Sequence, residues 1–173
     1  MFAFIRLRGF IAVLAFCSLP STLFATTVRP LSLGELHQEA ERVVVARVLE
    51  SRGFWVGTRI FTEHRVERVE ALRGVLPKQF RIMTLGGVVG DLGQRVEGAP
   101  LLRRNRTYVF FLKEMGGGDF YRPIGLWQGV AEVTSESGRL QPRASGATRL
   151  TLPLPQFPES LQALRLYFRE QGE

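Results

Sequence analysis

The arrangement of apolar and polar positions predicts a short helix followed by a series of β-strands. Ser32 and Glu35 have the spacing of a capping box, and apolar residues then recur at helical intervals up to Ala40. The β-branched run that follows predicts a mostly buried strand at 42–50. We expect this strand to end at SRGFWVG, because that stretch holds two glycines.

A long second strand is predicted in TRIFTEHRVERVEALRG, where the character of the side chains alternates. The alternation slips by one residue between Val66 and Val69, which indicates a β-bulge that bends the sheet toward closure. One face of this strand is expected to carry Ile60, Thr62, His64 and Val66.

Further strands are predicted in QFRIMTL and RTYVFFLK, and the second of these is apolar on both faces, so both faces should be covered. FYRPIG is expected to be a short strand that Pro123 confines to a sheet edge. LWQGVAEV is the last clear predicted strand. PESLQALRLYFRE predicts an amphipathic helix with Leu161, Leu164 and Phe168 on one stripe.

The pattern therefore predicts a mainly β, antiparallel fold with a short N-terminal helix and a C-terminal amphipathic helix. We expect residues 26–152 to form one domain. Residues 153–173 are expected to be a proline-rich connector and the terminal helix.

Residues 1–25 have the order of a secretory signal peptide, with Arg6 and Arg8 before an apolar core at 10–19. That core is shorter than the roughly 20 residues that cross a bilayer, so we expect cleavage after Ala25 and no transmembrane segment afterwards. The expected location is secreted or periplasmic. Cys17, the sole cysteine, leaves lipidation open as an alternative, although the bulky Phe16 precedes it.

The net charge of +7 and the pI near 10.7 change this picture little. The arginines are interspersed with acids, which is typical of a solvated basic surface, so we do not expect nucleic acid as a partner. Export together with the absence of cysteine after residue 25 favours a bacterial periplasm or exterior.

Candidate catalytic side chains are sparse. His37 and His64 are far apart in sequence, and no serine has a nucleophile-elbow context, so we assign no catalytic residue, metal or cofactor. Three carboxylates, Glu63, Glu67 and Glu70, alternate with arginines, which indicates cross-strand ion pairing. Those arginines are Arg59, Arg65, Arg68 and Arg73.

The glycine-rich stretch LGGVVGDLGQRVEGAP fits neither of the two phosphate-binding loop patterns. Its glycines permit positive φ and close approach of another backbone, which leaves two interpretations open: a crossing between strands, or a partner-binding loop. We expect 86–100 to line one end of the fold. The candidate binding residues are Gly86, Gly87, Gly90, Asp91, Gly93, Arg95, Gly98 and Pro100, with Trp127 and Gln128 as further contacts.

The order of these motifs resembles a largely uncharacterised family of exported bacterial proteins over residues 31–133. Glu70, Leu72 and Gly74 match its E-x-L-x-G strand end, and the five glycines with Pro100 match its loop. More distantly, the pattern is similar to the netrin-like domain of tissue metalloproteinase inhibitors. That likeness implies an OB-type barrel, closed or partly open, with a packed helix.

The inhibitors use an amino-terminal cysteine that this chain lacks after residue 25, so their mechanism does not transfer, and an exported protease is a partner suggested by fold alone. We expect an exported, non-enzymatic binding module that contacts an envelope or extracellular protein through the glycine-rich stretch. The alternatives are an envelope hydrolase using Glu63, His64 or Asp91, and a purely structural envelope protein.

Overall fold

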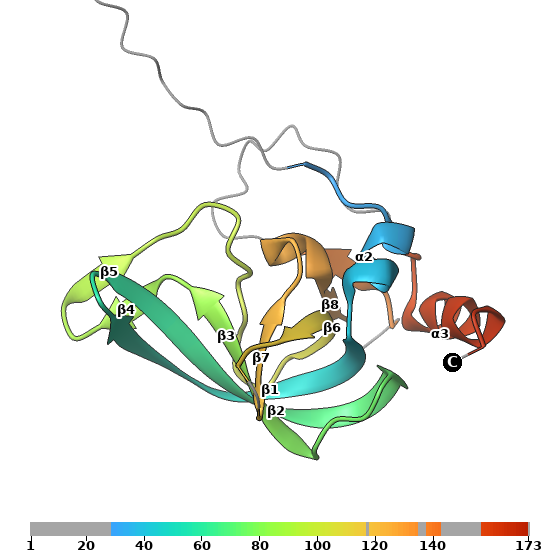
Figure 1. The fold of residues 1–173 in the computed structure, drawn as a ribbon, viewed down its shortest axis with the longest axis horizontal. Helices are drawn as coiled ribbons and strands as arrows, with labels where there is room; N and C mark the ends of the chain where they lie inside the picture. The colour runs from blue at the N-terminus through green and yellow to red at the C-terminus, as the bar shows by residue number, and fades with distance from the viewer. Residues whose placement is uncertain (1–28, 117, 135–137, 143–156, 173) are drawn as a thin grey trace, which may run out of the picture.

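The computed structural model describes residues 29–116, 118–134, 138–142 and 157–172 (Figure 1). The expected signal peptide, Cys17 and connector residues 153–156 lie outside them. The chain is mainly β, with helix α2 (Leu33–Glu39) near the start and helix α3 (Leu161–Glu170) at the end, as predicted. The strands are β1 (Arg42–Val56), β2 (Arg59–Arg73), β3 (Gln79–Leu85), β4 (Gly87–Val89), β5 (Leu92–Gln94), β6 (Thr107–Glu114), β7 (Phe120–Pro123), β8 (Val130–Val133) and β9 (Leu140–Pro142).

The main sheet has the strand order β1-β2-β3-β7-β6-β8-β9, and β1 also pairs with β6. The pairings β1–β2, β2–β3, β3–β7, β7–β6 and β6–β1 thus return to their starting strand. The sheet is mixed and not purely antiparallel, as the predicted antiparallel fold would have it, because β3 and β7 are parallel. Their neighbours β2 and β6 run in the same direction. Because β3 is antiparallel to β2 and β7 is antiparallel to β6, β3 and β7 must be parallel to each other.

Two predicted details of the strands are corrected by the pairing. β7 lies between β3 and β6 instead of at an edge, and Pro123 is tolerated because it is the last residue of the strand. SRGFWVG does not end the first strand, since β1 runs on to Val56 and turns at Gly57 and Thr58. Gly57 has φ 58°, and a glycine at the first position of a two-residue hairpin turn is favoured there.

The predicted β-bulge in the second strand is confirmed. Val45 pairs with Glu70 and Ala46 with Arg68, which leaves Val69 as the extra residue of β2. A second shift leaves Leu49 as an extra residue of β1. Each bulge increases the local twist, and the two long strands bend strongly (Figure 1).

Two apolar clusters lie on opposite sides of β1 and β6, which confirms that both faces of the apolar strands are covered. The inner cluster includes Val44 and Ala46 of β1 with Tyr108 and Phe110 of β6. The helix-side cluster takes the alternate residues of the same strands and adds side chains of the two helices. Its members include Val43, Val45, Val109, Phe111, Leu36, Leu164 and Phe168.

Candidate functional site

The glycine-rich stretch contains a small hairpin, β4–β5. It lies over the half of the β1–β2 hairpin that is nearest the turn between these two strands (Figure 1). The approach is close, since a Cβ at Gly53 would lie 2.1 Å from the Val88 carbonyl oxygen. A Cβ at Gly87, which has φ 140°, would lie 2.2 Å from the Thr62 hydroxyl oxygen. The Thr62 hydroxyl donates to the Gly86 carbonyl at 2.7 Å, which fixes the hairpin on β2.

Beneath this hairpin, His64 is hydrogen-bonded on both ring nitrogens. Its Nδ1 lies 2.7 Å from the Ser51 Oγ, and its Nε2 lies 2.9 Å from the Thr84 Oγ1. The strand register explains the arrangement, because Ser51 pairs with His64 across β1–β2 and Thr84 lies on the same face of neighbouring β3. Burial lowers the pKa of His64 to about 4, so the ring is neutral at pH 7.

A cavity of about 490 Å³ lies between the β4–β5 hairpin and this polar floor. Of the described residues that line it, Arg95 alone carries a full formal charge at neutral pH. The hydroxyls of Ser51 and Thr84 form the floor with His64. The remaining lining residues are Thr62, Leu85, Gly86, Gly87, Val88, Gly93, Gln94, Val96, Ala99, Pro100, Leu101 and Leu102.

The predicted binding residues of the glycine-rich stretch fall into three places. Gly90 and Asp91 form the exposed turn between β4 and β5, away from the cavity floor. Gly98 is buried against the Trp127 ring. The others line the cavity: Gly86, Gly87, Gly93, Arg95 and Pro100.

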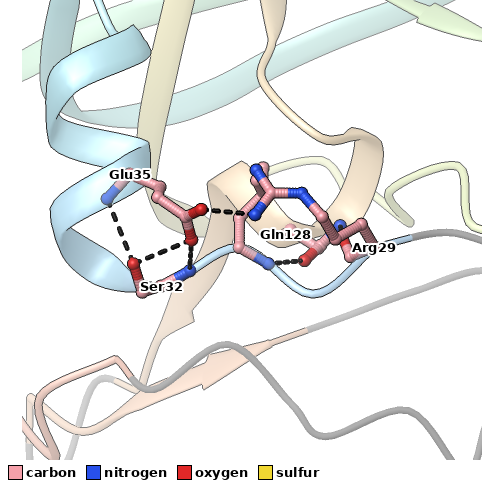
Figure 2. A network of polar contacts seen from close by, with 5 residues as sticks. Arg29, Ser32, Glu35 and Gln128 are labelled. Carbon is pink, nitrogen blue, oxygen red and sulfur yellow. Dashed lines mark hydrogen bonds and ion pairs between the residues drawn. The ribbon is translucent and has the colours of Figure 1, made fainter.

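Trp127 and Gln128 lie on a 3-10 turn, η2 (Leu126–Gly129), where the sequence predicts a strand; β8 begins only at Val130. Trp127 is 3% exposed, and its backbone N–H donates to the Gly98 carbonyl at 3.1 Å. Gln128 is buried and holds the chain before α2: its Oε1 accepts from the Leu31 N–H at 2.6 Å (Figure 2). The Gln128 side chain therefore anchors the segment before α2, whereas Trp127 holds the Gly98 segment through its backbone.

The acidic residues of β2, and Asp91 between β4 and β5, do not contact the ring nitrogens of His64. Glu63 lies on the opposite face from His64, 4.0 Å from Arg81, and Asp91 is in the exposed turn. The predicted cross-strand ion pairing is confirmed for Glu67, which lies 2.8 Å from Arg47 of β1. It is not confirmed for Glu70, whose partner is Arg165 of helix α3, at 2.7 Å. Neither partner is one of the arginines interspersed with these acids.

The side chains and helices of the described ranges bear on two other kinds of feature, a metal site and a membrane-spanning helix. No group of three or more His, Cys, Asp or Glu side chains there is arranged to hold a metal ion. Within the same ranges, none of the helices has both the length and the apolar character needed to cross a bilayer.

Sequence reasoning missed Ser51 and Thr84 as partners of His64. The position of the turn contains the information needed to find this contact. If Gly57 and Thr58 form a two-residue hairpin turn, counting the same number of residues away from the turn along each strand places Ser51 opposite His64. Treating the glycines of SRGFWVG as a strand end removed that register.

Neither the family models nor the curated proteins compared with this chain give a match. The function is therefore inferred from the geometry of the cavity.

Proposed function

We propose that this chain is an exported, non-enzymatic binding module built on an OB-type barrel. The cycle of pairings through β1, β2, β3, β7 and β6 supports a barrel, because closing a sheet removes its open edges. The inner cluster supports it too, since small barrels are filled by the inward-facing side chains of their strands. OB barrels commonly bind ligands across one face and its loops.

The observation that carries the binding function is the cavity between the β4–β5 hairpin and the floor of Ser51, His64 and Thr84. Its hydroxyls can exchange hydrogen bonds with amide groups, and Arg95 adds one positive charge at the wall. An extended polypeptide supplies both amides and carboxylates. We therefore assign to the cavity a segment of an envelope or extracellular protein, with an exported protease as one such partner.

The chemistry of His64 favours binding over hydrolysis. A Ser–His–acid triad needs a carboxylate on the second ring nitrogen, and here that nitrogen meets the Thr84 hydroxyl. General bases work best with a pKa near the working pH, whereas burial lowers the pKa of His64 to about 4. The described residues thus place no acid behind the histidine.

The binding function is tested by affinity capture from periplasm or culture medium. The bait is the wild-type chain, compared with Arg95→Glu, with Ser51→Trp, which fills the cavity, and with Arg68→Glu as an exposed control outside it. We expect proteins that both cavity variants lose and the control retains. The same captured proteins with every bait would contradict the proposal.

A hydrolase is the second candidate, favoured by the 2.7 Å contact between the Ser51 hydroxyl and His64. A fluorophosphonate probe distinguishes the two, because it labels activated serines covalently. Labelling that Ser51→Ala abolishes would establish the hydrolase, and an unlabelled wild-type chain agrees with the binding module.

A further inference from the structure

A second group of apolar side chains lies on the outer face of β2 and β3, opposite His64. Two neighbouring cavities open there and share Met83 as a wall; we call them together the outer groove. One has a volume of about 230 Å³ and is lined by Phe61, Leu85, Met115 and Leu126, among others. The other, of about 220 Å³, is lined by Arg52, Phe54, Glu63, Met83 and Phe120.

The side chains of the outer groove belong to neither apolar cluster of the core. Phe54, Phe61, Met83, Met115 and Phe120 are all half-buried, so each keeps apolar surface open to solvent. Methionine adapts its shape to varied partners, and two methionines line this surface. The groove is therefore apolar surface that packing of the described residues leaves uncovered.

The charges at the rim are mainly positive. Arg122 lines the first cavity and Arg52 the second, and no carboxylate of the described residues forms an ion pair with either. Lys113 pairs in register with Arg122 and adds to the charge. The acid of the groove, Glu63, lies 4.0 Å from Arg81. Charge complementarity thus favours an acidic occupant.

The form of the groove favours a polypeptide over a nucleic acid. Single-stranded nucleic acid stacks its bases on free aromatic faces. Here the Arg81 guanidinium already lies 3.7 Å from the Phe120 ring centroid, and Phe54 and Phe61 pack against each other at 6.3 Å. Both cavities are smaller than the roughly 300 Å³ typical of small-molecule sites, which suits single side chains.

We propose that the outer groove binds an extended acidic polypeptide segment, with two apolar side chains in the two cavities and carboxylates facing Arg52 and Arg122. In an extended chain, alternate side chains point the same way, so residues two apart can enter adjacent cavities. The first cavity of the groove shares Thr84, Leu85 and Pro100 with the cavity of the proposed function. The residues that the tests change are not shared: Arg52 and Arg122 line the groove alone, and Ser51 and Arg95 line the other cavity alone.

The test measures fluorescence anisotropy with a short labelled peptide in which leucine and glutamate alternate. We expect saturable binding that weakens about tenfold in the double variant Arg52→Glu/Arg122→Glu and is unchanged in Arg68→Glu. A matched peptide with lysine in place of glutamate should not bind. Met83→Glu, which changes the wall shared by the two cavities, should abolish binding. The melting temperature of the double variant Arg52→Glu/Arg122→Glu shows that its fold is intact.

Absence of saturable binding by the acidic peptide would overturn the inference, as would equal binding by the double variant and the wild type. An oligothymidylate that binds more tightly than the peptide and loses affinity in the same double variant would also overturn it, by assigning the groove to nucleic acid. The cavity variants Arg95→Glu and Ser51→Trp serve as a second control, because they should leave this binding intact.

Discussion

Ser51 and His64 face each other across the β1–β2 ladder, with Oγ and Nδ1 2.7 Å apart at the floor of the cavity. Thr84 occupies the other ring nitrogen, so the buried neutral ring donates to one hydroxyl and accepts from the other. Protonation would remove the acceptor nitrogen and leave a charge in a place that is 4% exposed. The stability of this end of the fold should therefore depend on pH.

We expect the free energy of unfolding to fall by about 3 kcal/mol between pH 6.5 and pH 4 because of His64. Its pKa in the folded chain, about 4, lies below the ordinary value of 6.5. Between pH 6.5 and pH 4 the unfolded state therefore binds a proton at His64 more readily than the folded state does. The contribution of neutral His64 to the free energy of unfolding is complete above pH 6.5. Urea unfolding of wild type and His64→Gln at both pH values measures it. An equal loss in the two proteins would contradict the assignment to His64.

Gly53→Ala should destabilise the chain by about 1–3 kcal/mol, because the new Cβ would lie 2.1 Å from the Val88 carbonyl and push β4 away from β1. Gly34→Ala is the matched control: nothing lies within 4 Å of its Cβ position, and alanine favours helix α2 by up to about 1 kcal/mol. Thermal unfolding should thus shift in opposite directions for the two variants. An unchanged or raised melting temperature for Gly53→Ala would show that the close approach has no energetic role.

Gln128→Leu should cost about 1–3 kcal/mol, since the buried Leu31 N–H would lose its acceptor. The same change also frees the Arg29 carbonyl, which accepts from Gln128 Nε2 at 3.1 Å. Gln128→Glu retains the acceptor oxygens and should be the milder change at low pH. Denaturant unfolding separates the two substitutions, and amide exchange at Leu31 reports the lost bond directly. Unchanged protection at Leu31 in the leucine variant would contradict this role.

Helix α3 should be held by its apolar stripe more than by its ion pair. Phe168→Ala is expected to cost about 3–5 kcal/mol, because Phe168 is 1% exposed within the helix-side cluster. Arg165→Ala should cost less than about 1 kcal/mol, since its contact with Glu70 is exposed to solvent. Chemical unfolding of both variants tests the ranking, and the reverse order would refute it.

The sequence predicted the elements well where local pattern decides them. The capping box at Ser32 and Glu35 and the stripe of Leu164 and Phe168 depend on residues near in sequence, and both are confirmed. The Val69 bulge was visible for the same reason, as a slip in alternation.

Apart from the 3-10 turn η2, which was predicted to be part of a strand, the errors concern relations between distant residues. The parallel contact of β3 with β7 follows from the pairings of five strands, β1, β2, β3, β7 and β6, which no local pattern contains. The floor of the cavity depends on the β1–β2 register, and that register depends on which pair of residues forms the turn. The prediction that the first strand ends at residue 50, before the two glycines of SRGFWVG, therefore concealed the Ser51–His64 contact.

The extra residue at Leu49 is a point where β1 can change length without exchanging its two faces. Before it, Val44, Ala46 and Val48 face the inner cluster; after it, Ser51 faces the cavity, while Arg52 faces the outer groove. A deletion of Leu49 would remove the bulge and its bend, but Ser51 would stay opposite His64 and Arg52 opposite Glu63. A one-residue deletion at 53–56 would instead carry Arg52 inward and Ser51 outward, because the β1–β2 turn sets the register of both residues.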